Sequence, residues 1–203
     1  MERLMDKKDV DMKFNGRSDL GIHQLLNARY SPRAFSDRDV TDAELELVLE
    51  AARWASSSHN EQPWRFLVTR KDQDGHAAML DSLWSMNRSW ADKAPILILN
   101  MVQRNFAYNN EENYFARHDL GGALAQLTAQ ATSMGMGLHQ LAGFHADQAR
   151  QAFQIPEALD VVSVLALGFP GNADVLEEPY RGRELKRSQR RPLSELVFMG
   201  RYK

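Results

Sequence analysis

The chain has 203 residues, of which 43% are apolar, and a formal net charge of −2, which suits one folded domain with a sizeable core and excludes a disordered chain. It contains no cysteine, which excludes disulfides, thiolate-bound zinc and cysteine nucleophiles and suits a reducing compartment. No apolar stretch reaches membrane-spanning length and the N-terminus is charged throughout, so we expect a cytoplasmic protein without a signal peptide or a membrane partner.

The near-neutral total conceals a basic segment near the C-terminus. Residues 181–191 hold six basic side chains and one acid, so the remainder of the chain has 19 basic and 26 acidic residues, a net charge of −7. The basic segment has no interleaved aromatic residues for base stacking, and the acidic remainder would repel a nucleic-acid backbone. We therefore expect no nucleic-acid partner. A solvated surface and a source of charge for binding a smaller phosphate remain as alternatives.

The first residues predict an arm followed by a helix. Residues 1–18 are highly charged and predict a surface arm. Residues 19–28 predict a helix with Leu20, Leu25 and Leu26 facing inward.

The clearest helix start lies further along the chain. Thr41 and Glu44 have the spacing of a capping box and precede apolar residues at helical spacing. The remaining pattern predicts helices near 75–83, 112–134 and 146–153, strands at 65–70, 95–102 and 161–167, an aromatic connection at 84–90, a loop at 168–192 and a last apolar element at 193–198. Helices interspersed with a few strands indicate an α+β domain.

Arg29, Ser31 and Arg33 are spaced by two residues around a proline that disfavours helix. In an extended segment, this spacing places all three side chains on one side. Two guanidinium groups and a hydroxyl are well suited to bind a phosphate. The same triplet, taken alone, also suits a solvated turn.

Residues 56–62, Ser-Ser-Ser-His-Asn-Glu-Gln, concentrate hydroxyl and amide groups directly after a predicted helix. Such groups offer donors and acceptors to the edge of a planar heterocycle, and Asn87 is a further amide that could serve there. The alternatives are an ordinary helix end followed by a turn for the loop and a helix cap for Asn87. The six histidines show no metal-binding spacing, so we expect no metal site.

Five segments follow one another in a characteristic order. Residues 29–35 read Arg-Tyr-Ser-Pro-Arg-Ala-Phe, and residues 54–66 read Trp-Ala-Ser-Ser-Ser-His-Asn-Glu-Gln-Pro-Trp-Arg-Phe. Residues 119–123 read Asp-Leu-Gly-Gly-Ala near the start of the predicted long helix, residues 135–144 contain three glycines, and residues 190–197 read Arg-Arg-Pro-Leu-Ser-Glu-Leu-Val. Together they resemble the nitroreductase superfamily of FMN-dependent oxidoreductases.

The sequence departs from the family pattern at three positions. Tyr30 stands where the family has a second arginine, in a position that contributes mainly backbone. Ser56 replaces the usual proline, and His59 stands where a small residue is common. None of these changes removes a group that binds flavin, but the last two alter the loop around the ring.

The resemblance implies a fold and a set of FMN-binding residues. The fold would be a mainly antiparallel or mixed sheet flanked by helices, with residues 19–198 as a single FMN-binding domain in an intertwined homodimer and residues 180–203 reaching the partner subunit. The residues implied at the phosphate are Arg29, Tyr30, Ser31, Arg33 and Arg190, with Arg187 or Arg191 as a second C-terminal cation. Those implied at the flavin ring are Asn87, Gln140, Ala142 and Gly143, with Ser56, Ser57, Ser58 and Asn60 from the other subunit and Gln62 supporting the loop.

The resemblance also implies an activity. NAD(P)H would transfer hydride to flavin N5 and leave, and a nitroaromatic, quinone or similar electron-poor acceptor would then be reduced at the same face in a ping-pong reaction. The flavin carries this chemistry, so no catalytic acid or base is expected. The alternatives are a specialised flavin branch, such as a dehalogenase, an azoline oxidase or a flavin-fragmenting enzyme, and a non-catalytic binding protein with a basic tail.

Overall fold

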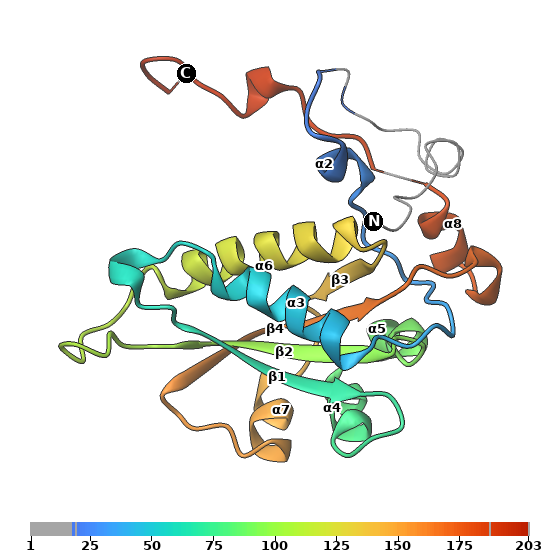
Figure 1. The fold of residues 1–203 in the computed structure, drawn as a ribbon, viewed down its shortest axis with the longest axis horizontal. Coiled ribbons are helices and arrows are strands. Elements are labelled where there is room, and N and C mark those ends of the chain that lie inside the picture. The colour runs from blue at the N-terminus through green and yellow to red at the C-terminus, as the bar shows by residue number, and fades with distance from the viewer. Residues whose placement is uncertain (1–17, 19, 187, 203) are drawn as a thin grey trace.

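The structure, a computed structural model, describes residues 18, 20–186 and 188–202. Its centre is a four-stranded antiparallel sheet in the order β1-β2-β4-β3, with helices packed on both faces (Figure 1). This arrangement confirms the predicted α+β class. Within the part of the chain that is described, no helix is both long and apolar enough to cross a bilayer.

The two central strands are the most apolar. β2 (Ile96–Gln103) and β4 (Leu159–Gly168) pair antiparallel, with Ile96 opposite Leu167. Because both sheet faces are covered by helices, β2 is buried along nearly its whole length. β1 (Trp64–Arg70) borders β2 on one side, and β3 (Gly137–Leu141) forms the opposite edge of the sheet beside β4.

One sheet face is covered by the two longest helices, α3 (Asp42–Arg53) and α6 (Ala116–Ser133) (Figure 1). The capping box is formed as predicted: Thr41 Oγ1 accepts from the Glu44 amide at 3.2 Å, and the Glu44 carboxylate accepts from the Thr41 amide at 2.9 Å. Leu120 and Leu127 of α6 are fully buried in this core layer.

The opposite face is covered by short helices, α4 (His76–Ser82), α5 (Ser85–Ala91) and α7 (Ala146–Ala152). Trp90 of α5 is the largest fully buried side chain of this second core layer. Residues 84–90 therefore do not form the expected connection. The sequence Ser-Met-Asn-Arg-Ser-Trp-Ala of α5 exposes polar residues on most sides, and this obscures its helical period.

The remaining elements flank the sheet near one end. α2 (Gln24–Ala28) packs on α6, and α8 (Tyr180–Glu184) lies close to the chain segment that follows α2 (Figure 1). The described residues also include three single turns of 3-10 helix: η1 (Ser58–Asn60), η2 (Ala173–Val175) and η3 (Leu193–Glu195). The end of the chain, beyond η3, extends away from the body and exposes apolar side chains such as Met199, 87% exposed.

Several predicted bounds need correction. The first helix begins at Gln24 rather than 19, so Leu20 precedes it and is exposed. Leu26 is exposed because a helix of five residues buries only part of one side. The long helix begins at Ala116 rather than 112, and residues 168–192 contain η2 and α8 as well as loop. The predicted arm, residues 1–18, lies outside the described residues apart from Ser18.

Candidate functional site

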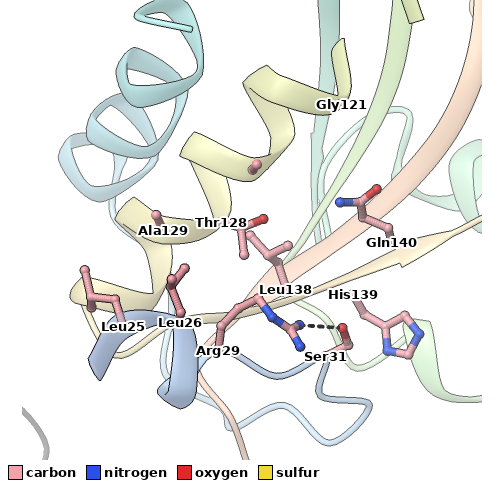
Figure 2. A pocket seen from close by; sticks show the side chains of 11 residues that line it. Leu25, Leu26, Arg29, Ser31, Gly121, Thr128, Ala129, Leu138, His139 and Gln140 are labelled. Carbon is pink, nitrogen blue, oxygen red and sulfur yellow. Dashed lines mark hydrogen bonds between the residues drawn. The ribbon is translucent and has the colours of Figure 1, made fainter. Parts of the chain in front are cut away.

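Arg29 and Ser31 meet in the wall of a cavity of about 430 Å³. Arg29 Nη1 donates to Ser31 Oγ at 3.2 Å, as the dashed line in Figure 2 shows. The cavity lies between α2, the outer side of α6 and the edge strand β3. Its lining residues are Leu25, Leu26, Arg29, Ser31, Gly121, Ala125, Thr128, Ala129, Leu138, His139 and Gln140.

Cationic side chains crowd this end of the molecule. Burial lowers the pKa of the Arg29 guanidinium, and the nearby charge of Arg190 lowers it further. Burial also lowers the pKa of Arg33, with Arg183 acting in the same direction and Glu184 opposing it. An arginine keeps its proton even so, so the three neighbouring positive charges Arg29, Arg33 and Arg190 favour the binding of an anion.

The backbone of the Arg29–Arg33 segment is fixed by a carboxylate from α8. Glu184 Oε2 accepts from the Arg33 amide at 2.9 Å and Oε1 from the Ala34 amide at 3.5 Å. Burial and the charge of Glu184 together raise the pKa of the Tyr30 phenol. The one acid in the basic segment thus acts as an anchor for the motif that precedes it by about 150 residues.

His139 is a member of the site that sequence reasoning missed. It lies on β3 in the cavity wall, its Nδ1 is 3.1 Å from the Pro32 carbonyl oxygen, and its ring centre is 4.7 Å from that of Trp90. Burial lowers its pKa to about 4, and the charges of Arg33 and Arg29 add to the effect. The sequence gives no clear signal for it, because residues 137–141 contain the polar pair His139 and Gln140 and show no two-residue alternation.

A second group of predicted residues lies just beyond β3. Asn87 Nδ2 donates to the Gly143 carbonyl at 2.9 Å, and the Trp84 amide donates to the same oxygen at 3.1 Å. A Cβ at position 143 would lie 2.6 Å from Asn87 Nδ2, so the contact requires glycine. Asn87 is on helix α5, not in the loop that we expected.

The hydroxyl and amide loop does not line the cavity. Ser58 is tied to Asp119 near the start of α6, the same part of the helix in which Gly121 lines the cavity. The cavity lining of this chain nevertheless includes none of the loop residues Ser56, Ser57, Ser58, Asn60 and Gln62.

The predicted residues fall into three groups in the structure. Arg29, Ser31 and Gln140 share the cavity, with Arg190 close enough to act on Arg29. Asn87 and Gly143 are in contact beside exposed Ala142, and the loop does not line the cavity. Arg187 lies outside the described residues.

No three histidine or carboxylate side chains among the residues that the structure describes gather in the way that holds a metal ion.

The sequence and the fold of this chain are similar to those of known proteins. The model of the nitroreductase family matches residues 26–93. An uncharacterized 15.4 kDa protein of Mycolicibacterium smegmatis is 30% identical over 145 residues, covering 68% of this chain and 97% of that protein. A crystal structure described as an oxidoreductase containing FMN superposes with a TM-score of 0.88 at 29% identity, covering 93% of this chain and 96% of that one. The chain belongs to the nitroreductase family.

A shorter match lies within the same family. The oxygen-insensitive NADPH nitroreductase of Helicobacter pylori strain J99 is 49% identical over 51 residues, which is 24% of each chain. Membership of the nitroreductase family confirms the resemblance, the nitroreductase-like fold and the oxidoreductase class that the ordered motifs predicted.

Proposed function

We propose that this nitroreductase-family protein is an FMN-dependent oxidoreductase that uses NAD(P)H to reduce nitroaromatic, quinone or similar electron-poor acceptors. The proposal rests on the cavity wall, where Arg29 donates a hydrogen bond to Ser31 and the charge of Arg190 acts on the Arg29 guanidinium. These groups can donate hydrogen bonds to a phosphate. Asn87 and Gly143, beyond β3, could contact the edge of a planar ring, and FMN has both a phosphate and such a ring.

The phosphate would be held by the Arg29 guanidinium, the Ser31 hydroxyl and the charges of Arg33 and Arg190. Guanidinium groups make paired, charge-assisted hydrogen bonds to phosphate oxygens. Tyr30 would contribute its backbone, since its phenol is buried beside Glu184. Glu184 holds the backbone of the motif in place and so limits the ordering that binding would require.

The ring would lie along β3 toward Asn87. The Asn87 amide already donates one hydrogen to Gly143, so its oxygen is the group left to accept from a ring N–H. Bound FMN supplies the hydride chemistry, and the protein orients two flat molecules in contact. Gln140, Ala142 and Gly143 would line the ring, and nearby arginines would stabilise negative charge on it.

We further propose that a second copy of the chain completes the site as a homodimer. Three features support this. The loop with Ser57, Ser58 and Asn60 contributes nothing to the cavity lining of its own chain. The small residues Gly121, Gly122 and Ala125 of α6 are exposed, and so are Leu193 and Met199 of the C-terminal segment. Residues 19–198 would form the single FMN-binding domain, with Gln62 supporting the loop and residues 180–203 reaching the partner. The cysteine-free composition suits the cytoplasm.

The first test is optical. Purified protein should be yellow and should bleach on addition of NADH or NADPH, with recovery on addition of a quinone. A protein that takes up no FMN would refute the proposal. A protein that binds FMN but is not reduced by either nucleotide would support a specialised flavin branch instead.

The second test concerns the phosphate. Arg29→Ala should weaken FMN binding by about 1.5–3 kcal/mol, the value of a lost charged hydrogen bond, as measured by flavin fluorescence during titration. Arg104→Ala is the matched control, because Arg104 is exposed and pairs with Asp160 away from the cavity. Equal FMN affinity in Arg29→Ala and the wild type would contradict the assignment.

A heterodimer of two different variant chains tests whether each FMN site is shared between subunits. If each site combines the motif of one chain with the loop of the other, a heterodimer of an Arg29→Ala chain and an Asn60→Ala chain contains one intact site and one doubly defective site. Half of the FMN should then bind with wild-type affinity. If each chain forms its own site, neither site is intact and no wild-type fraction is seen.

A further inference from the structure

The loop between α3 and β1 has a strained backbone. Three non-glycine residues of the loop adopt left-handed backbone conformations: His59 at φ 54°, Asn60 at φ 55° and Gln62 at φ 51°. Such conformations persist only where the surrounding contacts hold them. The loop therefore needs an anchor.

Contacts inside the loop are not sufficient to orient it. Ser57 Oγ accepts from the Gln62 amide at 3.0 Å, and Gln62 Nε2 donates to the Asn60 carbonyl at 3.0 Å. Both bonds would move with the loop. Glu61 Oε1 accepts from the Ala107 amide at 2.8 Å, but Ala107 is itself in an exposed loop.

Asp119 provides a fixed point. Its Oδ2 accepts from the Ser58 amide at 2.9 Å, and its Oδ1 lies 3.2 Å from His118 Nδ1. Only 5% of Asp119 is exposed, and the next residue, Leu120, is fully buried in the core under α3. The carboxylate is therefore carried by a helix whose inward side is buried in the core.

The identity of the residue at 119 also points to the loop. Its neighbours on the inward side of α6 are Ala116, Leu120 and Ala123, all buried and apolar. A buried carboxylate is costly unless its oxygens are hydrogen-bonded. An apolar side chain at position 119 would fill the same space in the core. A carboxylate there differs in that it accepts a hydrogen bond from the Ser58 amide.

We propose that Asp119 is a positioning residue for the flavin site of the partner subunit. By fixing the Ser58 amide, it sets the orientation in which Ser57, Ser58 and Asn60 are presented beyond their own chain. This inference rests on the proposed FMN function and the shared site. It adds a link between α6 and the edge of the flavin ring in the proposed dimer.

Three variants separate position from charge. Asp119→Asn keeps a carbonyl oxygen in place for the Ser58 amide, Asp119→Ala removes the acceptor, and Asp119→Glu keeps the charge but moves it by one methylene. FMN affinity should fall about 10- to 100-fold in Asp119→Ala, as expected for a lost hydrogen bond to a charged group. It should stay within about threefold of the wild type in Asp119→Asn, and Asp119→Glu should resemble Asp119→Ala.

Hydrogen–deuterium exchange in FMN-free protein measures the loop directly. Peptides covering 57–62 should exchange faster in Asp119→Ala and at the wild-type rate in Asp119→Asn. Asp160→Ala is the matched control, because Asp160 accepts from Arg117 at the start of the same helix but does not touch the loop. This control should leave loop exchange unchanged.

The results test the positioning role of Asp119 separately from the proposed FMN function. Unchanged loop exchange in Asp119→Ala would overturn the positioning role, as would an Asp119→Asn variant as defective as Asp119→Ala. If Asp119→Ala does not fold, the comparison of Asp119→Asn with Asp119→Glu carries the same test. If the wild type binds no FMN, the proposed function fails, while the exchange results still decide whether Asp119 holds the loop.

Discussion

His139 should make the FMN-free protein sensitive to mild acid. The imidazole is enclosed between Trp90 and the Pro32 carbonyl, with the positive charges of Arg33 and Arg29 nearby. Burial, first, and these charges, second, lower its pKa to about 4. Because a carbonyl only accepts, Nδ1 carries the hydrogen of the neutral ring in this contact.

The size of the effect follows from the difference between the folded and unfolded chains. In the unfolded chain a histidine has a pKa of about 6.5. Between this value and about 4, the unfolded chain binds a proton at position 139 and the folded chain does not, so stability is lost as the pH falls through this window. At about 1.4 kcal/mol per pH unit the loss reaches up to about 3 kcal/mol, and partial exposure of the ring reduces it to about 2 kcal/mol.

Urea unfolding at pH 7 and at pH 4.5 measures this loss. His139→Gln keeps a group that can donate to the Pro32 carbonyl but does not titrate. Between the two pH values, its free energy of unfolding should fall by about 2 kcal/mol less than that of the wild type. His76, whose pKa burial also lowers, is present in both proteins and cancels in the comparison. Equal losses in the two proteins would refute the reasoning.

Three further substitutions test other contacts. Thr41→Ala removes the helix cap and should cost about 1 kcal/mol of unfolding free energy, measured in urea; no change would mean that the cap is not formed in solution. Gly171→Ala would place a Cβ 2.5 Å from the Phe35 carbonyl oxygen and should cost about 1–3 kcal/mol, with a stability equal to the wild type as the contrary result. Gly143→Ala would place a Cβ 2.6 Å from Asn87 Nδ2, so FMN titration should show weaker binding with little change in stability; unaltered affinity would argue against a role of this contact.

Local sequence determined the parts of the fold that depend on local rules. The Thr41 capping box and the apolar runs of β2 and β4 were predictable because cap chemistry and burial on two faces leave direct traces in the sequence. α5 was missed because only Trp90 and Ala91 of the helix are buried. β3 was missed because it is a five-residue edge strand with a polar pair, His139 and Gln140, in place of alternation.

The sequence predicts members of the candidate site but not their arrangement. The spacing predicts that Arg29, Ser31 and Arg33 share one side; in the structure Arg29 and Ser31 are hydrogen-bonded in the cavity wall, whereas Arg33 does not line the cavity. No local pattern indicated that Glu184 anchors the next residues of the motif, because the contact joins positions 151 apart in the chain. The left-handed backbone at His59 and Asn60 was also hidden, since it is held by Asp119, 61 residues beyond Ser58.

The contact between Glu184 and the Arg33 amide has a consequence for truncation of the chain at its C-terminal end. Glu184 belongs to α8, which follows all four strands and α6 in the chain, yet its carboxylate fixes the Arg33 and Ala34 amides. A truncation just before residue 184 would leave the strands and α6 complete but would remove this acceptor. If the Arg29–Arg33 segment holds the FMN phosphate, as we propose, such a truncation would lower the flavin content more than the stability of the fold.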